Sequence, residues 1–416
     1  MMMRKKKLLF GIAVIAAIAL LIHLCGEGCK HVKVLPNNTV YAIIDSINEP
    51  DNKPQTAEIY IDASASMKGY FISDSPVFSG QLANLVGMLD NKKVFFVDET
   101  QPRTGMMTNL ISDLRSQPNK PVSNFDKLLA DMSHKVDTGK VVFLVTDGIM
   151  SVGKTTPKAL QELGYAVRDS LKNFNGAIAL FKFESEFKSD KSYSYFDYIT
   201  KKNRKGVYYY TMNDEPIEVS IQKRPYYVIA VGAKENIRAL VNNKLGAKEE
   251  IYFGIHDHDG HTTNRQSEDI DCQLEDLYKP VVLNATLPQC LVSLGKDYFN
   301  QNTEVYLNGD ELVPLSAYNN SIIDEAGDIN IVISLDAQSG LALVTNPTTG
   351  YVEFTVKVRN QIPKAWENLN SDNDSNIAND IDEQKRTYGL LTMLKGIKEA
   401  LDKDEYLLEI KFKFKK

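Results

Sequence analysis

Two apolar runs of this chain each lead into an aspartate, and this pair constrains the fold more than any other feature. Ile59-Tyr60-Ile61 precedes Asp62, and Val141 to Val145 precedes Thr146 and Asp147. Short apolar runs bounded by turn residues are typical of buried strands in parallel sheets. Because the loops at the carboxyl ends of adjacent parallel strands converge, we expect both aspartates at one edge of one sheet.

Hydroxyl side chains accompany the first aspartate. Ser64 and Ser66 follow Asp62 at every second position. Together with Asp147 they form a set of oxygen ligands, which Mg²⁺ and Mn²⁺ prefer, and these ions need few protein ligands because they keep several waters. The pattern predicts a Mg²⁺ or Mn²⁺ site, whereas the simpler alternative is that the two aspartates cap the helices that follow.

These residues resemble a known family. The pattern Asp62-x-Ser64-x-Ser66, with Thr146-Asp147-Gly148 closing a later strand, is similar to the von Willebrand factor type A domain over roughly residues 56–245. The resemblance implies a doubly wound, mostly parallel α/β sheet and a metal-ion-dependent adhesion site. In that site the two serines bind the ion closely, and the two aspartates often act through water.

The family pattern also implies a hydroxyl from a third loop. Ser123 stands at the start of a helix expected over residues 124–132, and we take it as this ligand. Thr108 fits locally as an alternative but lies farther from Asp147 in the chain. The resemblance therefore implies a metal site made of Asp62, Ser64, Ser66, Ser123 and Asp147.

Segments with strand and helix patterns alternate through the first half of the chain. This alternation predicts a mostly parallel sheet that is covered on both faces. The expected strands are 58–62, 93–97, 140–145, 177–183 and 226–231, and the expected helices are 79–89, 124–132, 157–174 and 235–242.

The second half of the chain has a different pattern. From residue 246 short strand-like runs separated by turn residues predict a β-rich, sandwich-like C-terminal domain over 246–416, with one helix near 383–401. Residues 31–55 contain prolines and asparagines without periodicity, so we expect a linker there.

A basic cluster precedes an apolar stretch at the N-terminus. Arg4-Lys5-Lys6-Lys7 comes before Leu8 to Cys25, which predicts a retained membrane anchor within residues 1–30. The body would then lie outside the cytoplasm, in a bacterial periplasm or cell envelope. A cleaved signal peptide, or a lipoprotein attached through Cys25 or Cys29, is the alternative.

The function implied by these features is binding without catalysis. The ion would coordinate an acidic residue of a protein partner, and the mild net charge of −6 gives no reason to expect nucleic acid. One alternative is a metal-dependent ester hydrolase, although His134 is the only histidine between residues 56 and 245. A second is a phosphate-loop NTPase that uses Gly148–Thr155, although the acidic strand that usually follows such a loop here precedes it.

Three further groups of residues each have two possible interpretations. His256 to His261 is either a solvated loop or a weak metal site. Cys272 and Cys290 either form a disulfide or remain free thiols. A tyrosine cluster is either a recognition surface or a set of residues on strand edges, of which we favour the second; it comprises Tyr193, Tyr195, Tyr198, Tyr208, Tyr209 and Tyr210.

Overall fold

The structure, a computed structural model, describes residues 39–43, 56–255 and 281–414, with gaps inside these ranges. The gaps are 73–75, 90, 98–101, 104–111, 114–124, 137–139, 151–156, 190–193, 198–201, 214, 242–244, 288, 293, 310, 319–321, 324–326, 335–349 and 351.

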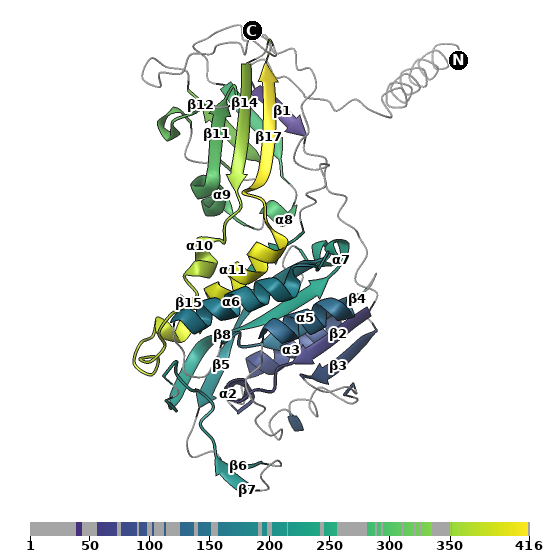
Figure 1. The fold of residues 1–416 in the computed structure, drawn as a ribbon, viewed down its shortest axis with the longest axis vertical. Coiled ribbons are helices and arrows are strands. Elements are labelled where there is room, and N and C mark those ends of the chain that lie inside the picture. Colours follow the sequence, from purple (N-terminus) through teal and green to yellow (C-terminus); the bar gives the residue numbers. More distant parts are fainter. Residues whose placement is uncertain are drawn as a thin grey trace, which may run out of the picture.

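A six-stranded mixed sheet forms the centre of the α/β part (Figure 1). Its order is β3 (Lys92–Phe96), β2 (Thr56–Ile61), β4 (Lys140–Thr146), β8 (Val219–Gly232), β5 (Ala177–Ser189) and β9 (Glu249–Phe253). The strands β3, β2 and β4 are parallel, whereas β8 is antiparallel to β4 and β5, and β9 is antiparallel to β5.

The mixed α/β class is therefore confirmed, but the expectation of a mostly parallel sheet applies only to β3, β2 and β4. The reason lies in how β5 and β8 are connected. Between them the chain forms the small hairpin of β6 (Ser194–Asp197) and β7 (Lys202–Lys205). A parallel pair needs a crossover connection, usually a helix, whereas strands joined through a hairpin pair antiparallel.

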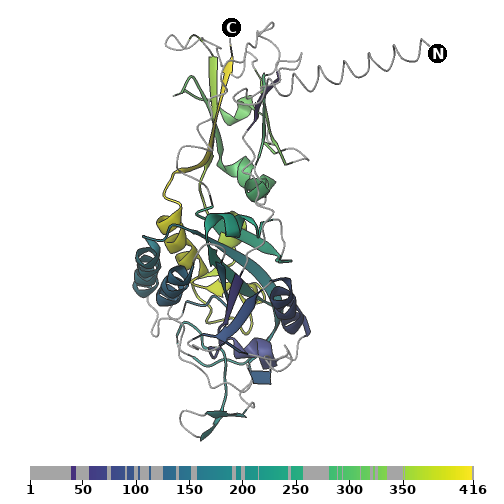
Figure 2. The same ribbon diagram turned by 90° about the vertical axis from the view of Figure 1, so that its right-hand side faces the viewer.

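Both faces of the six-stranded sheet are buried. Alternate residues of β4 point to opposite faces, with Phe143 on one face and Leu144 on the other. The face of Phe143 packs against α2 (Lys68–Ile72), α3 (Pro76–Met88) and α7 (Lys234–Arg238). The face of Leu144 packs against α5 (Phe125–Lys135), α6 (Pro157–Leu171) and α11 (Leu390–Leu401), so that helices lie on both sides (Figure 2).

Two smaller sheets share one apolar core and form the β-sandwich-like part (Figures 1 and 2). The first contains β1 (Thr39–Ile43), β10 (Val281–Thr286) and β13 (Ile329–Ile333). The second contains β12 (Glu311–Leu312), β11 (Thr303–Leu307), β14 (Val352–Arg359) and β17 (Tyr406–Phe414). Short helices α8 (Gln289–Val292), α9 (Lys296–Asn302) and η1 (Leu315–Ala317) connect these strands. Strand β1 comes from the segment expected to be a linker.

The chain between β14 and β17 leaves the sandwich and packs on the six-stranded sheet. We call this segment, residues 360–405, the strap. It contains α10 (Lys364–Glu367), β15 (Asn370–Ser371), η2 (Glu383–Lys385), β16 (Thr387–Tyr388) and α11. Because β14 and β17 are paired neighbours, the strap leaves and re-enters the sandwich at adjacent strands (Figure 1).

The helix expected near 383–401 exists as α11, but it covers the α/β sheet and not the β-rich part. It packs tightly on α6, where two glycines face each other. A β-carbon at Gly396 would lie 2.5 Å from the carbonyl oxygen of Gly164 and 3.1 Å from Cβ of Val167. The two helices can lie this close only because both positions lack a side chain.

A Gly396→Ala substitution is therefore expected to reduce the free energy of unfolding by about 1–3 kcal/mol, because the helices must separate. Gly80→Ala is the matched control, since Gly80 lies in α3 and a β-carbon there meets nothing within 4 Å. Alanine at that position should stabilise the protein by about 0.5–1 kcal/mol through its higher helix propensity. Urea denaturation of both variants checks the prediction, and equal effects would contradict the close helix contact.

The predicted N-terminal anchor lies outside the described residues, as do Cys25 and Cys29. Among the helices that the structure does describe, none is long and apolar enough to cross a membrane. The structure thus gives no support to the predicted membrane anchor, or to the periplasmic or cell-envelope location drawn from it. Both predictions are therefore corrected.

Candidate functional site

The carboxyl ends of β2 and β4 bring the two predicted aspartates to one edge of the sheet. Ile61 pairs with Val145 in the parallel ladder, and the amide of Asp62 donates to the carbonyl oxygen of Val145 at 2.9 Å. The ladder thus continues one residue past β2. Asp62 therefore stands beside the Thr146-Asp147 end of β4, as expected from the sequence.

The Asp62 carboxylate organises the first loop. Its Oδ1 accepts a hydrogen bond from the amide of Ser64 at 2.8 Å, and its Oδ2 accepts one from Oγ1 of Thr146 at 2.9 Å. The hydroxyl oxygens of Ser64 and Ser66 are 3.2 Å apart. Asp62 and Ser64 are buried, whereas Ser66 is only half-buried, so Ser66 marks the open side of this group.

The Asp147 carboxylate is almost fully buried, with 3% of the residue exposed. Its Oδ1 accepts a hydrogen bond from the amide of Ile149 at 3.2 Å, but its Oδ2 accepts none from any residue that the structure describes. Burial, followed by the nearby charge of Asp62, raises the pKa of Asp147 to about 6, although the Ser66 hydroxyl and Arg224 act in the opposite direction. A buried carboxylate oxygen without a donor is costly unless a cation or a proton meets it.

Two further buried side chains are cationic. Lys68 stands two residues after Ser66 and is 1% exposed, and burial lowers the pKa of its ammonium to about 8. Arg224 of β8 is also 1% exposed. The guanidinium donates to the carbonyl oxygen of Arg386 at 2.8 Å, to that of Gln384 at 3.3 Å and to the Tyr209 hydroxyl at 3.2 Å.

The strap lies against the turn that follows β4. The amide of Met150, just after Asp147, donates to the carbonyl oxygen of Tyr388 at 3.1 Å. The hydroxyls of Tyr227 and Thr387 are 3.0 Å apart. A β-carbon at Gly148 would lie 2.8 Å from the Tyr227 ring, and the backbone there has a φ of 70°, so this turn requires glycine.

A second contact fixes the strap to the loop before β8. Both oxygens of Asp374 accept hydrogen bonds, one from the Tyr209 hydroxyl at 2.5 Å and one from the amide of Met212 at 2.7 Å. Tyr209 is buried and its ring packs edge-on against Phe187. Two side chains thus hold the strap: Arg224, which belongs to β8, and Asp374, which belongs to the strap itself.

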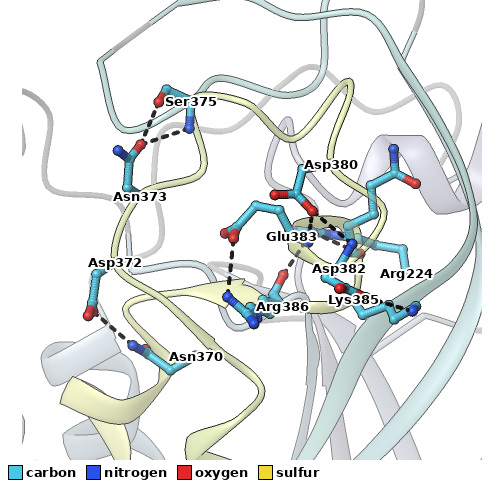
Figure 3. A network of polar contacts seen from close by, with 11 residues as sticks. Arg224, Asn370, Asp372, Asn373, Ser375, Asp380, Asp382, Glu383, Lys385 and Arg386 are labelled. Atoms are coloured by element: carbon cyan, nitrogen blue, oxygen red, sulfur yellow. Dashed lines mark hydrogen bonds and ion pairs between the residues drawn. The ribbon is translucent and has the colours of Figure 1, made fainter.

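Polar contacts within the strap keep it compact between these two anchors (Figure 3). Oδ1 of Asp380 accepts hydrogen bonds from the amides of Asp382 and Glu383 at 2.9 and 3.1 Å. Arg386 pairs with Glu383 at 3.6 Å, and its carbonyl oxygen is the one that faces Arg224. The turn that carries Arg386 is therefore held by contacts within the strap as well as by Arg224.

Several predicted residues fall outside the described part of the chain. These are Ser123 and Thr108, residues 151–155 of the phosphate-loop pattern, His256 to His261, Cys272, Tyr193 and Tyr198. Cys290 lies in α8, and Tyr195 lies in β6. Among the three tyrosines of the cluster whose burial the structure describes, Tyr208 and Tyr209 are buried and Tyr210 is half-exposed.

The carboxylates of the edge are few. Within the residues that the structure describes, no three or more histidine, cysteine, aspartate or glutamate side chains are grouped so as to hold a metal ion. The edge offers two carboxylates and the hydroxyls of Ser64 and Ser66. Any ion there would depend on hydroxyl and water oxygens as well as on carboxylates.

The sequence patterns missed Arg224, whose charge acts on Asp147, and Asp374, which accepts a hydrogen bond from Tyr209. Arg224 stands at the start of an apolar run and carries no motif that distinguishes it. Its bonding partners in the strap lie 160 and 162 residues later in the chain. Only the docking of the strap brings them together. Comparisons with protein-family models, with curated proteins and with solved structures gave no match for this chain.

Proposed function

We propose that the edge formed by β2 and β4 binds Mg²⁺ or Mn²⁺ and that the protein is a metal-dependent protein-binding module of the von Willebrand factor type A kind. Asp62, Ser64, Ser66 and Asp147 would hold the ion, and Ser123 would add a hydroxyl from the third loop. A carboxylate of a protein partner would complete the coordination. No catalytic step is part of the proposal.

The observation that carries the proposal is the buried Oδ2 of Asp147. It accepts no hydrogen bond within the described residues, yet it lies close enough to Asp62 for that charge to raise its pKa. Two buried carboxylates that repel each other are stabilised by a shared divalent cation. The neighbouring hydroxyls of Ser64 and Ser66 are suitable oxygen ligands for a hard ion, and Ser66 is accessible from solvent.

A partner carboxylate fits the charge of the site. An ion held by two carboxylates and neutral hydroxyls keeps water in its remaining positions, which an acidic side chain can replace. The contact is then charge-assisted and depends on the ion, which favours specificity for acidic residues.

Calorimetric titration of Mg²⁺ and Mn²⁺ into the full chain tests the proposal. We expect saturable binding that is weakened about 100-fold or more in an Asp62→Ala, Ser64→Ala double variant, because a charged and a neutral ligand are both lost. The matched control is Asp131→Ala with Ser133→Ala, the same residue types at the same spacing in α5, where Asp131 is exposed and Ser133 is half-buried. Equal binding by all three proteins, or none by the wild type, would refute the site.

Two further titrations separate the alternatives. With Mn²⁺ bound, added acetate should lower the water-proton relaxation caused by the ion, because the carboxylate replaces a water ligand. ATP as a separate titrant tests the phosphate-loop pattern at Gly148–Thr155. Saturable ATP binding that survives the Asp62→Ala, Ser64→Ala change would favour a nucleotide-binding function instead.

A further inference from the structure

Arg224 stands where the carboxylate edge and the strap meet. Tyr227, three residues later on β8, pairs with Thr146 in the sheet, so Arg224 lies next to the loop that carries Asp147. Its hydrogen bonds go to the strap carbonyls of Gln384 and Arg386 and to the Tyr209 hydroxyl. One buried side chain therefore faces both parts of the molecule.

The charge of Arg224 has no direct ion pair among the described residues, because all three of its hydrogen-bond acceptors are neutral oxygens. Asp147 lies near enough for the two charges to influence each other, and each favours the charged form of the other. At a fully buried position such interactions are weakly screened by solvent. Asp147 thus provides negative charge that helps keep the guanidinium buried.

A divalent cation at the edge would compete for the same carboxylate. Its positive charge would repel the guanidinium, and the Asp147 charge that balances Arg224 would be directed to the ion instead. The hydrogen bonds from Arg224 to the strap would then be weakened. By thermodynamic linkage, docking of the strap would weaken metal binding to the same extent.

We infer that Arg224 is a positioning residue that makes metal binding at the Asp62–Asp147 edge and docking of the strap mutually antagonistic. The inference rests on the proposed metal site but goes beyond it, because it makes the strap a regulator of that site. A partner that displaces the strap would raise the metal affinity, and a bound ion would loosen the strap.

Hydrogen exchange of the strap amides in the wild-type protein, with and without saturating Mg²⁺, is the first test. The amides of Thr387 and Gly389 bond to carbonyl oxygens of Leu369 and Ser371 and report on the folded strap. We expect Mg²⁺ to speed their exchange about three- to tenfold, because repulsion between the ion and the guanidinium weakens the hydrogen bonds to the strap. Unchanged exchange at saturating Mg²⁺ would overturn the coupling while leaving the metal site intact. Absence of any metal binding would overturn both.

Three variants separate charge from hydrogen bonding. Arg224→Met removes the charge, so Mg²⁺ should bind about three- to tenfold more tightly and strap exchange should be fast with or without the ion. Arg224→Lys keeps the charge but lacks the planar set of donors, so the metal affinity should stay within about twofold while strap exchange rises. Arg238→Met is the matched control, since Arg238 of α7 donates to the carbonyl oxygen of Ile255, and it should change neither quantity. An Arg224→Met protein with unchanged metal affinity would refute the inference.

Discussion

Replacing Asp147 with asparagine is expected to raise the free energy of unfolding of the metal-free protein at pH 8, by about 3 kcal/mol at most. The carboxylate is buried, and the pKa of Asp147 is raised to about 6 in the folded protein from an ordinary value near 4. Each pKa unit corresponds to about 1.4 kcal/mol between the protonation states. Asparagine carries no charge and avoids this cost.

The sign of the pH dependence follows from the direction of the shift. A raised carboxyl pKa means that the folded state binds the proton more tightly than the unfolded state does. Protonation of Asp147 therefore contributes its full share to the free energy of unfolding below about pH 4, and this share is lost as the pH rises through about 6. The metal-free wild-type protein should therefore lose stability over this range, and the asparagine variant should not. Urea denaturation at pH 4, 6 and 8 with a chelator measures both.

Two controls accompany this prediction: one removes a different carboxylate, and the other adds Mg²⁺. Asp169→Asn on α6 removes an exposed carboxylate and is the control for the loss of one charge. Mg²⁺ should restore stability to the wild-type protein at pH 8 but not to the Asp147→Asn protein, if the proposed site binds the ion. An asparagine variant that is less stable than the wild type at pH 8 would show that the Arg224 charge outweighs burial.

Truncation of Trp366 to alanine is expected to reduce the free energy of unfolding by about 3–5 kcal/mol, the usual range for a large buried aromatic side chain. Trp366 is 1% exposed in α10 and packs on Tyr227 of β8, with ring centroids 6.0 Å apart. The loss should be independent of pH and of Mg²⁺. Urea denaturation measures it, with the half-exposed Tyr165→Ala as the aromatic control, for which we expect a loss below about 1 kcal/mol. If Trp366→Ala lowers the free energy of unfolding only slightly, the strap is not part of the core.

Much of the α/β part follows from local patterns. The apolar runs at 58–62 and 140–145 are the strands β2 and β4, and their carboxyl ends bring Asp62 and Asp147 together as predicted. This works because parallel pairing of two neighbouring strands places the residues that follow them at one edge. The alternation between faces is visible in the sequence for the same reason.

The direction of β8 and the position of α11 could not be predicted in this way. An apolar run shows that a strand is buried, but not the direction in which it pairs. The amphipathic pattern of α11 shows that one face is covered, but not that α6 covers it through Gly164 and Gly396. The surroundings of Asp147 were missed for the same reason, because Arg224 and Asp374 reach the site only through contacts between distant parts of the chain.

The route of the strap has a consequence for the order in which the protein folds during synthesis. One face of the six-stranded sheet is covered partly by Trp366 and α11, which are made more than a hundred residues after β9. Until then the apolar side chains of β5 and β8 on that face lack this cover, while the sandwich strands are being made. During this time one face of the sheet in the nascent chain is only partly covered. Apolar surface exposed at such a stage favours aggregation. A chain that ends just after β9, near residue 255, should remain at this stage and depend on chaperones.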